Sequence, residues 1–281
     1  MQVRDALRLS AQKFKESPTP SLDARLLLAH AMNCTQGELL INYDQELKKN
    51  VEARFLEFVE RRRKHEPIAY ILGKQEFYGL EFIVNKHVLI PRPETELIID
   101  VLKEEAEKNA QNQTIDILDL GTGSGAISVC LAKEISLANI TAVEISATAI
   151  KVAESNVLKH QVQTQVNIVK SNWYSEIEKS KKYDYIVSNP PYICRSEINQ
   201  MSKETIEFEP DLALYADNEG LSSYQAIIQN ARNFLKGDGK IVFEIGYSQK
   251  NKILNLLKSG GFKNFIVKQD ISGLDRVIIA Y

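Results

Sequence analysis

A polar motif follows an apolar run in the second half of the chain. The motif is Asn189-Pro190-Pro191-Tyr192, and it comes directly after the run at residues 185–188. Each proline fixes φ at about −65° and lacks an N–H, so the chain must turn out of a sheet here. The Asn189 side-chain oxygen and the Pro190 carbonyl then become rigid hydrogen-bond acceptors. The motif predicts a device that holds a planar N–H group at the end of a strand, with a plain strand-ending turn as the alternative.

A glycine-rich turn comes earlier, after another apolar run. It reads Gly121-Thr122-Gly123-Ser124-Gly125 and opens a helical pattern at Ala126. In this context glycines let a nucleotide-like ligand approach the backbone closely. Read as GxGxG, the turn suits S-adenosylmethionine, whereas with Ala126 it also satisfies the dinucleotide pattern GxGxxA.

An acidic residue, Glu144, ends the next apolar run. A carboxylate there can accept hydrogen bonds from both ribose hydroxyls of a cofactor, each bond contributing about 1.5 to 3 kcal/mol. Both cofactor classes use such an acid, so Glu144 leaves the choice between them open.

The polar motif favours methyl transfer over hydride transfer. An NAD-dependent oxidoreductase would need a proton-transfer residue such as His or Tyr near the strand ends, and none is obvious. If Asn189 and Pro190 each accept one N–H of an amide or amine, the nitrogen becomes pyramidal and its developing positive charge is stabilised. Tyr192 would stack on the planar group. Attack on a sulfonium methyl then depends mainly on positioning and needs no strong base, so we expect Asn189, Pro190 and Tyr192 to be catalytic.

Strand and helix patterns alternate from residue 115 onward, which predicts a doubly wound, mainly parallel sheet. The link at residues 268–275 is too short for a helical crossover, so the last two strands should pair antiparallel. The predicted strands are Ile115–Leu120, Ile140–Ile145, Val166–Val169, Tyr183–Val187, Lys240–Ile245, Phe265–Val267 and Arg276–Tyr281.

The first part of the chain has helical patterns and no convincing strand. Thr35 and Glu38 have the spacing of a capping box. The basic run at residues 61–65 is interpreted as a solvated helix end, where cations are favourable, rather than as a site for an acidic partner. Residues 90–96, Ile-Pro-Arg-Pro-Glu-Thr-Glu, should open another helix. We assign no chemistry to the charged residues of that segment.

Composition narrows the class of protein. The 281 residues carry a formal net charge of −2, so no global positive field supports a polyanionic partner. No apolar leader is present, and no apolar run approaches the roughly 18 residues that span a bilayer. The three cysteines and four histidines are scattered, so no disulfide framework, zinc site or other metal is expected. We expect a cytoplasmic protein with no membrane contact and no direct nucleic-acid binding.

With these motifs in this order, the chain resembles the class I methyltransferases that act on nitrogen, and specifically the family that methylates a glutamine of peptide chain release factors (the HemK or PrmC type). Asn-Pro-Pro-Tyr alone is shared with adenine methyltransferases that act on nucleic acid, which remain the alternative, with an NAD-dependent oxidoreductase third. The match covers nearly the full length and includes residues 67–73, 77–79, 90–96, 119–125, 189–193, 209–214 and 273–276.

The resemblance implies a Rossmann-like, seven-stranded methyltransferase sheet with its last strand antiparallel. It implies a helical substrate-docking domain at residues 1–74, a β-hairpin linker at 75–90 and a methyltransferase domain at 91–281. The substrates would be class I release factors, methylated on the glutamine of a Gly-Gly-Gln motif so that translation termination is modulated. S-adenosylmethionine would be consumed and S-adenosylhomocysteine released.

The resemblance also implies roles for single residues. Gly121 to Gly125 would line the cofactor, Glu144 would bind its ribose, Trp173 would pack near its adenine, and Asn189 would touch it as well. Asn189, Pro190, Pro191, Tyr192 and Ile193 would hold the substrate amide. Two residues depart from the family pattern. Glu144 stands where Asp is usual, and Asn172 stands where an Asp often precedes the Trp, so recognition of the adenine amino group would lack a charge.

Overall fold

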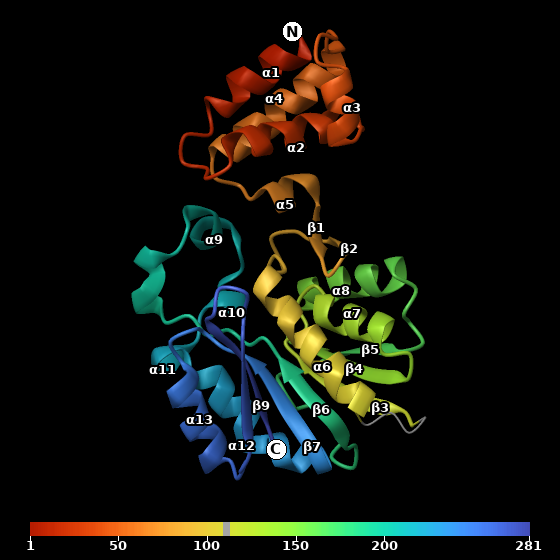
Figure 1. The fold of residues 1–281 in the computed structure, drawn as a ribbon, viewed down its shortest axis with the longest axis vertical. Helices are drawn as coiled ribbons and strands as arrows, with labels where there is room; N and C mark the ends of the chain where they lie inside the picture. The colour runs from red at the N-terminus through yellow and green to blue at the C-terminus, as the bar shows by residue number, and fades with distance from the viewer. Residues whose placement is uncertain (109–112) are drawn as a thin grey trace. The chain divides into compact units, whose positions relative to one another are not determined.

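The computed structural model describes residues 1–108 and 113–281 (Figure 1). The chain divides into two compact units. The helical unit comprises Met1–Lys74 and the short segment Met201–Phe208, and the sheet unit comprises Gln75–Gln200 and Glu209–Tyr281. The segment 201–208 therefore belongs with the first 74 residues, although it lies far along the chain. In the described part of the chain, no helix combines the length and apolar character that crossing a membrane requires.

The helical unit has its own apolar core. Fully buried side chains of the first, second and fourth helices, among them Val3, Leu27 and Phe55, form its centre. The capping box at Thr35 is confirmed, because its hydroxyl accepts from the Glu38 amide (3.1 Å) while the Glu38 carboxylate accepts from the Thr35 amide (2.7 Å). The helices are α1 (Val3–Ala11), α2 (Pro20–Met32), α3 (Gln36–Ile41), α4 (Lys49–Arg63), α5 (Ile68–Leu72) and α9 (Lys203–Phe208).

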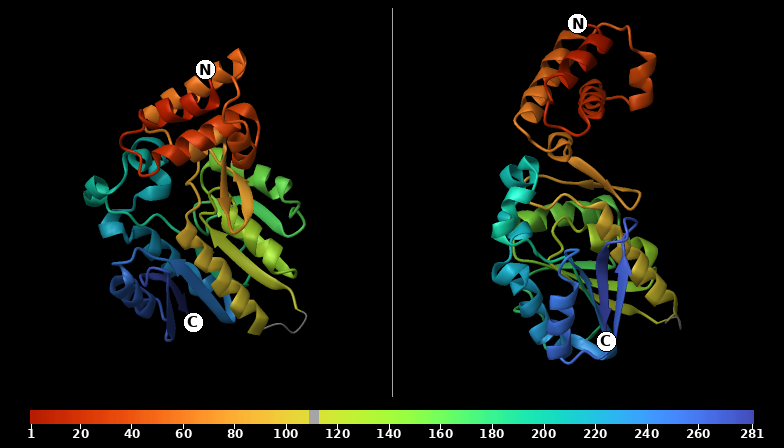
Figure 2. Two further views of the ribbon diagram at one scale, coloured as in Figure 1. Left: turned by 45° about the horizontal axis from the view of Figure 1, so that its top comes forward. Right: turned by 60° about the vertical axis from the view of Figure 1, so that its left-hand side comes forward.

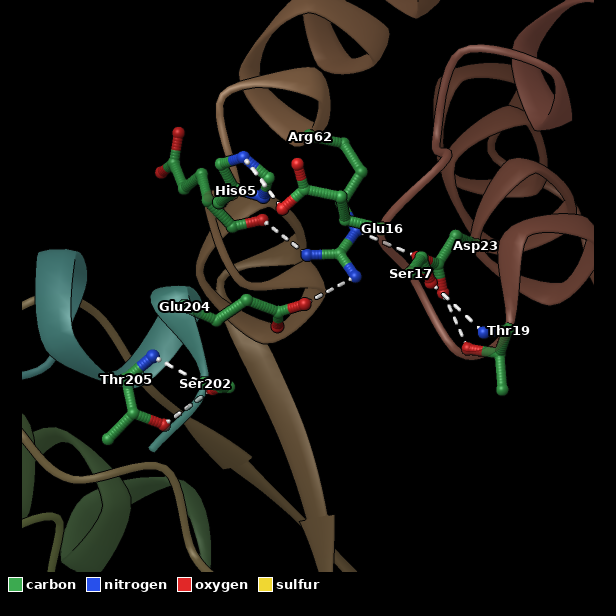
Figure 3. A network of polar contacts seen from close by, with 10 residues as sticks. Glu16, Ser17, Thr19, Asp23, Arg62, His65, Ser202, Glu204 and Thr205 are labelled. Atoms are coloured by element: carbon green, nitrogen blue, oxygen red, sulfur yellow. Dashed lines mark hydrogen bonds and ion pairs between the residues drawn. The ribbon is translucent and has the colours of Figure 1, made fainter. Parts of the chain in front are cut away.

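A buried arginine joins α9 to the rest of the helical unit (Figure 3). Arg62 contacts Asp23 at 2.7 Å and Glu204 at 2.7 Å, and the side chains of Arg62 and Asp23 are only 5% and 4% exposed. Burial alone would lower the pKa of Arg62, but hydrogen bonds to Glu204 and Asp23 outweigh it and raise that pKa. Of the basic run interpreted as a solvated helix end, Arg63 is exposed and Arg62 is not. For Arg62 that interpretation is wrong, because its guanidinium has two carboxylate partners inside the unit.

The sheet unit is built on seven strands in the order β5-β4-β3-β6-β7-β9-β8. All seven predicted strands are present. β9 runs antiparallel to both β7 and β8, which confirms the predicted antiparallel pairing of the last two strands. A separate two-stranded sheet is formed by β1 (Lys74–Phe77) and β2 (Leu80–Ile83). The seven strands are β3 (Ile115–Leu120), β4 (Ala138–Glu144), β5 (Val166–Lys170), β6 (Tyr183–Ser188), β7 (Leu235–Glu244), β8 (Phe265–Gln269) and β9 (Asp275–Ala280).

Helices cover both faces of this sheet (Figure 2). Because side chains alternate along a strand, Ile117 of β3 packs with α6, α7 and α8, whereas its neighbour Leu118 packs with α12 and α13. The helices of the unit are η1 (Pro93–Thr95, a 3-10 turn), α6 (Glu96–Lys108), α7 (Ala126–Glu134), α8 (Ala147–Lys159), η2 (Arg195–Gln200, also 3-10), α10 (Asp211–Leu214), α11 (Asp217–Gly220), α12 (Ser222–Phe234) and α13 (Lys250–Ser259).

Candidate functional site

A cavity of about 470 Å³ lies within the sheet unit, at the carboxyl ends of the central parallel strands. This volume lies in the range of small-molecule sites, and the position is where open α/β sheets bind ligands. Most of the residues predicted for the site line this cavity, whereas Gly125, Pro190, Tyr192 and Ile193 do not. Those in the lining are Gly121, Thr122, Gly123, Ser124, Glu144, Trp173, Asn189 and Pro191.

The glycine turn is shaped by its backbone and by close packing. The amides of Gly121 and Thr122 both donate to the carbonyl of Val143 (2.9 Å each), which ties the turn after β3 to β4. Gly125 starts α7 with φ +81°, and a Cβ there would lie 3.4 Å from Ala153 of α8. The positive φ favours glycine at this position, whereas the distance to Ala153 is an ordinary van der Waals contact. Gly125 therefore shapes the turn from behind the cavity rather than from its lining.

Asp119, near the end of β3, is fully buried beneath this turn. Its Oδ2 accepts hydrogen bonds from Thr122 (2.7 Å) and Ser128 (2.6 Å). Burial raises the pKa of Asp119 to about 6, although the two hydroxyl groups act in the opposite direction. The carboxyl group thus braces the turn to the first part of α7.

Glu144 ends β4 with both carboxylate oxygens engaged by backbone amides. Oε2 accepts from Gly123 (3.0 Å), and Oε1 accepts from Ile145 and Ser146 (2.9 Å each). A carboxylate offers about four lone-pair positions, so one position on Oε2 is left for a ligand hydroxyl. If Glu144 accepted hydrogen bonds from both ribose hydroxyls, one of its three hydrogen bonds from backbone amides would have to break.

Trp173 stands in the cavity wall over the glycine turn. Its Cζ3 would lie 3.7 Å from a Cβ on Gly121, an ordinary van der Waals distance, so the indole ring packs directly over the turn. Trp173 has φ +49°, an uncommon conformation for a large residue, and its carbonyl accepts from the Ser171 hydroxyl (3.0 Å). The neighbouring Asn172 also lines the cavity. An aromatic face and a side-chain amide therefore lie together where the family pattern implies an adenine site.

Asn189 directly follows β6 and shares the cavity with Glu144 and the glycine turn. Its Nδ2 donates to Oγ1 of Thr95 in η1 at 3.1 Å. With the nitrogen engaged by Thr95, the side-chain oxygen is the group left to accept from a ligand.

Tyr192 lies behind the cavity wall. Its hydroxyl donates to Oε1 of Glu244 (3.3 Å) and its carbonyl accepts from Nε2 of Gln249 (2.9 Å). Burial is the main reason that the pKa of Tyr192 is raised, and the nearby Glu244 charge raises it further. The structure thus brings Asn189 and Pro191 to the cavity, and places Tyr192 where it supports the loop. Its predicted stacking on a substrate stays a prediction.

An ion pair is present at the cavity wall. Arg92, which lines the cavity, pairs with the buried carboxylate of Glu209, and Glu209 also accepts from the Ile90 amide (3.2 Å). This contact holds residues 90–92 to the chain that follows α9.

Three residues in contact with the predicted site have no role expected from sequence: Thr95, Glu244 and Gln249. Glu244 had one available signal, an acid at the end of a buried strand, which is the same signal that singled out Glu144. Thr95 lies in the segment 90–96, which the resemblance includes without a role for Thr95, and Gln249 carried no signal. Both residues are far from the loop in sequence and reach it only through the fold.

Two family models match the chain. Residues 5–73 match the PrmC N-terminal domain, and residues 93–208 match the methyltransferase small domain. The two matches fall on the helical segment and on the part of the chain that carries the glycine turn and the Asn-Pro-Pro-Tyr motif.

Two relatives and one solved structure illustrate the similarity. A bifunctional methyltransferase of Rickettsia conorii (strain ATCC VR-613 / Malish 7) is 42% identical over 93% of this chain and 54% of its own length, so the chain spans about half of that relative. The catalytic domain of hMettl16, solved with a MAT2A 3′UTR hairpin, shares the fold with a TM-score of 0.59 at 16% identity, over 72% of this chain and 76% of that one.

The other relative matches from end to end. The release factor glutamine methyltransferase of Buchnera aphidicola subsp. Schizaphis graminum (strain Sg) is 38% identical over 99% of this chain and 98% of its own length. Such identity over the full length of both proteins, together with the two family models, fixes the family. The chain belongs to the family of release factor glutamine methyltransferases.

Proposed function

We propose that the protein transfers a methyl group from S-adenosylmethionine to the side-chain amide nitrogen of the glutamine in the Gly-Gly-Gln motif of class I release factors, and so modulates translation termination. The observation that carries the proposal is that Asn189 stands in the wall of the same cavity as the glycine turn and Glu144. The side chain proposed to hold the substrate amide and the residues proposed to hold the cofactor therefore face the same cavity.

The residues of the cavity fit S-adenosylmethionine. Glu144 has one acceptor position left for a ribose hydroxyl, and Trp173 with Asn172 offers a flat face and an amide for the adenine. When bound, the cofactor supplies an electrophilic methyl group on a sulfonium. The contribution of the chain is to hold and orient the two reactants in a small enclosed space.

The substrate amide would be held by two acceptors of the Asn-Pro-Pro-Tyr loop. Asn189 Oδ1 accepts one N–H and the Pro190 carbonyl accepts the other, so the nitrogen lone pair turns toward the methyl group. The positive charge that develops on nitrogen is stabilised by these fixed oxygens. Pro191 and Ile193 complete the loop beside them, and Tyr192 supports it from behind.

The helical unit would dock the release factor. Its match to the PrmC N-terminal domain supports this role. A cytoplasmic location follows from the proposed substrate, because release factors act on ribosomes.

The direct test is to incubate the protein with labelled S-adenosylmethionine and a purified class I release factor, and then map the label by peptide mass spectrometry. We expect a single methyl group on the Gly-Gly-Gln glutamine, and none on a release factor in which that glutamine is replaced by alanine. Label on adenine of added DNA or RNA, with none on the release factor, would instead support an adenine methyltransferase.

Replacing the predicted amide holder tests the mechanism. Asn189→Ala should lower kcat about a hundredfold or more, because one preorganised polar contact to the transition state is lost. Binding of S-adenosylhomocysteine, measured by calorimetry, should survive. Asn167→Ala is the matched control, because Asn167 is exposed on β5 and lies outside the cavity lining. Normal turnover by Asn189→Ala would rule out the assigned role.

A further inference from the structure

Glu244 is a buried carboxyl group beside the Asn-Pro-Pro-Tyr loop. It is the last residue of β7 and is 1% exposed. In the sheet, Ser188 of β6 lies opposite Phe243, so Asn189 and Glu244 come next at the same edge. A buried carboxyl group is costly unless hydrogen bonds satisfy it. Its presence at this edge therefore points to a role in the site.

Two hydroxyl groups face this carboxyl group. The Tyr192 hydroxyl donates to Oε1 at 3.3 Å, and the Thr95 side chain lies close enough to favour the ionised form of Glu244. Among the described residues, Oε2 has no hydrogen-bond partner, so an acceptor is free there for the Thr95 proton. Thr95 also accepts from Asn189 Nδ2 at 3.1 Å. The Thr95 hydroxyl thus lies between Asn189, to which it is hydrogen-bonded, and Glu244, whose Oε2 has no hydrogen-bond partner within the described part of the chain.

The direction of these hydrogen bonds matters for catalysis. The oxygen and nitrogen of an Asn side chain occupy nearly equivalent positions, so the amide fits either way round. Only the orientation with the oxygen toward the cavity lets Asn189 accept from a substrate N–H. In the opposite orientation, the N–H groups of the Asn189 side chain would face the N–H groups of the substrate.

Thr95 alone does not decide between the two orientations, because a hydroxyl both donates and accepts. Above its pKa of about 7, Glu244 is ionised and can only accept, so the Thr95 proton is then directed to the carboxylate. The Thr95 oxygen then has only lone pairs to offer Asn189, and it must face the nitrogen.

We propose that Glu244 is a positioning residue for methyl transfer. Its ionised carboxylate fixes, through the Thr95 hydroxyl, the orientation of the Asn189 amide, so that the Asn189 oxygen faces the substrate. This inference rests on the proposed function and adds no chemical step to it.

The main test is Glu244→Gln, which keeps the size of the side chain but lets it donate as well as accept. With a release factor as substrate, kcat should fall about a hundredfold, since the substrate contact is then misoriented in nearly all of the molecules. KM for the release factor and the affinity for S-adenosylhomocysteine, measured by calorimetry, should stay within about twofold, because the contact acts on the transition state. A merely structural role would lower these affinities together with kcat.

Variants at Thr95 test the relay while the Glu244 carboxyl group itself stays in place. Thr95→Val removes the hydroxyl at constant shape and should lower kcat as much as Glu244→Gln, whereas Thr95→Ser should recover at least about tenfold of that loss. The double variant Thr95→Val/Glu244→Gln should be no slower than either single variant, because both break the same relay. Additive losses would overturn the inference.

Glu105→Gln is the matched control for removal of a buried carboxylate. Glu105 lies on α6, pairs with Lys108 and Lys240 and does not line the cavity. If wild-type protein methylates the release factor and Glu244→Gln keeps its kcat, only the positioning role fails. If wild-type protein leaves the release factor unmodified, the proposed function itself fails. Should Glu244→Gln not fold, as judged by circular dichroism, the Thr95 variants decide.

Discussion

Three carboxyl groups at or near the carboxyl ends of β3, β4 and β7 differ in what surrounds them. Glu144 is bound by three backbone amides at the cavity wall. Asp119 and Glu244 are fully buried and face hydroxyl groups, and burial raises their pKa values to about 6 and about 7. One kind of side chain therefore offers a proposed ligand contact at Glu144, braces the glycine turn at Asp119 and has a proposed positioning role at Glu244.

The proposed ligand contact of Glu144 gives a binding prediction. Glu144→Ala should weaken binding of S-adenosylhomocysteine by more than about tenfold, because a charge-assisted hydrogen bond contributes about 1.5 to 3 kcal/mol. Three backbone amides also lose their acceptor, so the turn that lines the cavity should loosen. Calorimetry measures the affinity directly, and fluorescence of Trp173, the only tryptophan of the chain, reports the same event from within the cavity wall.

Glu144→Asp separates the charge from the reach of the side chain. The shorter acid keeps a carboxylate at the strand end, so its affinity should lie between those of wild type and Glu144→Ala. Equal affinities for all three proteins would contradict the ribose assignment.

At the scale of elements, the Asn-Pro-Pro-Tyr loop is held from two sides. On one side it pairs with the chain after α10, where Ile193 donates to Leu214 and accepts from Ala216 (3.0 Å each). On the other, Gly220 of α11 lies so close that a Cβ would stand 2.1 Å from the Tyr192 carbonyl oxygen. The loop therefore depends on neighbouring elements for its position as well as on its own prolines.

This contact predicts that Gly220→Ala displaces the loop. The new methyl group would clash with backbone, and Gly220 also has φ +80°, where a side chain is strained. We expect kcat to fall about tenfold or more, because a displacement of about 1 Å in a catalytic group is enough to do so. The change is measured with the release factor assay.

Two other glycines serve as controls for the clash. Gly273 has φ +76° with nothing within 4 Å of the position that a Cβ would take, and Gly237 has neither a positive φ nor a close neighbour. Gly273→Ala therefore tests backbone strain alone, and Gly237→Ala tests the substitution alone. A loss for Gly220→Ala no larger than that for Gly273→Ala would show that contact with the loop is unimportant.

The strands were predictable because each is a run of apolar, largely β-branched residues with its own turn signals. Prediction from apolar runs fails at the start of β7. Its expected start at Lys240 is wrong, because the strand begins at Leu235 and includes Gly237 and Gly239. A Cβ on Gly239 would lie 2.9 Å from the Tyr183 carbonyl oxygen, and the register shifts between Tyr183 and Tyr185. A bulge thus carries the strand through glycines.

A site residue was predictable only where the motif that identifies it lies within one short segment of the sequence. Asn189 and the glycine turn met that condition. Thr95 is 94 residues from Asn189, and Glu244 is 52 residues from Tyr192, so their contacts arise from the order of strands in the sheet. The place of α9 in the helical unit was likewise hidden, because it depends on Arg62, about 140 residues earlier, and local patterns carry no such information.

At the scale of the whole molecule, the two units are joined by three chain crossings. The chain passes between them at residues 74–75, 200–201 and 208–209. The last two crossings bracket α9 and lie between the Asn-Pro-Pro-Tyr loop and Glu209, which binds Arg92. A protein of two units need not unfold in one step. Trp173 lies in the sheet unit, so its fluorescence follows unfolding of the unit that holds the cavity.

This reporter allows the charge state of Glu244 to be read from stability. Burial raises the pKa of Glu244 to about 7 from 4.5, against the opposing effects of Thr95, Arg276 and Tyr192, while Glu94 raises it further. The Tyr224 hydroxyl donates to the backbone carbonyl of Glu244 and not to the carboxyl group of its side chain. Because the folded state holds this proton more tightly than the unfolded state, the stabilising contribution is present at low pH. It is lost as pH rises from 4.5 through 7.

Comparison with Glu244→Gln isolates this contribution, because other groups titrate over the same range. Asp119 shifts stability in the same direction, whereas His30 and His160, whose pKa values burial lowers, shift it in the opposite one. All three are common to both proteins. In urea unfolding followed by Trp173 fluorescence, the free energy of unfolding of wild type minus that of the variant should fall by about 2 to 3 kcal/mol between pH 5 and pH 8. A difference independent of pH would mean that Glu244 is already ionised at pH 5 and that its burial costs little.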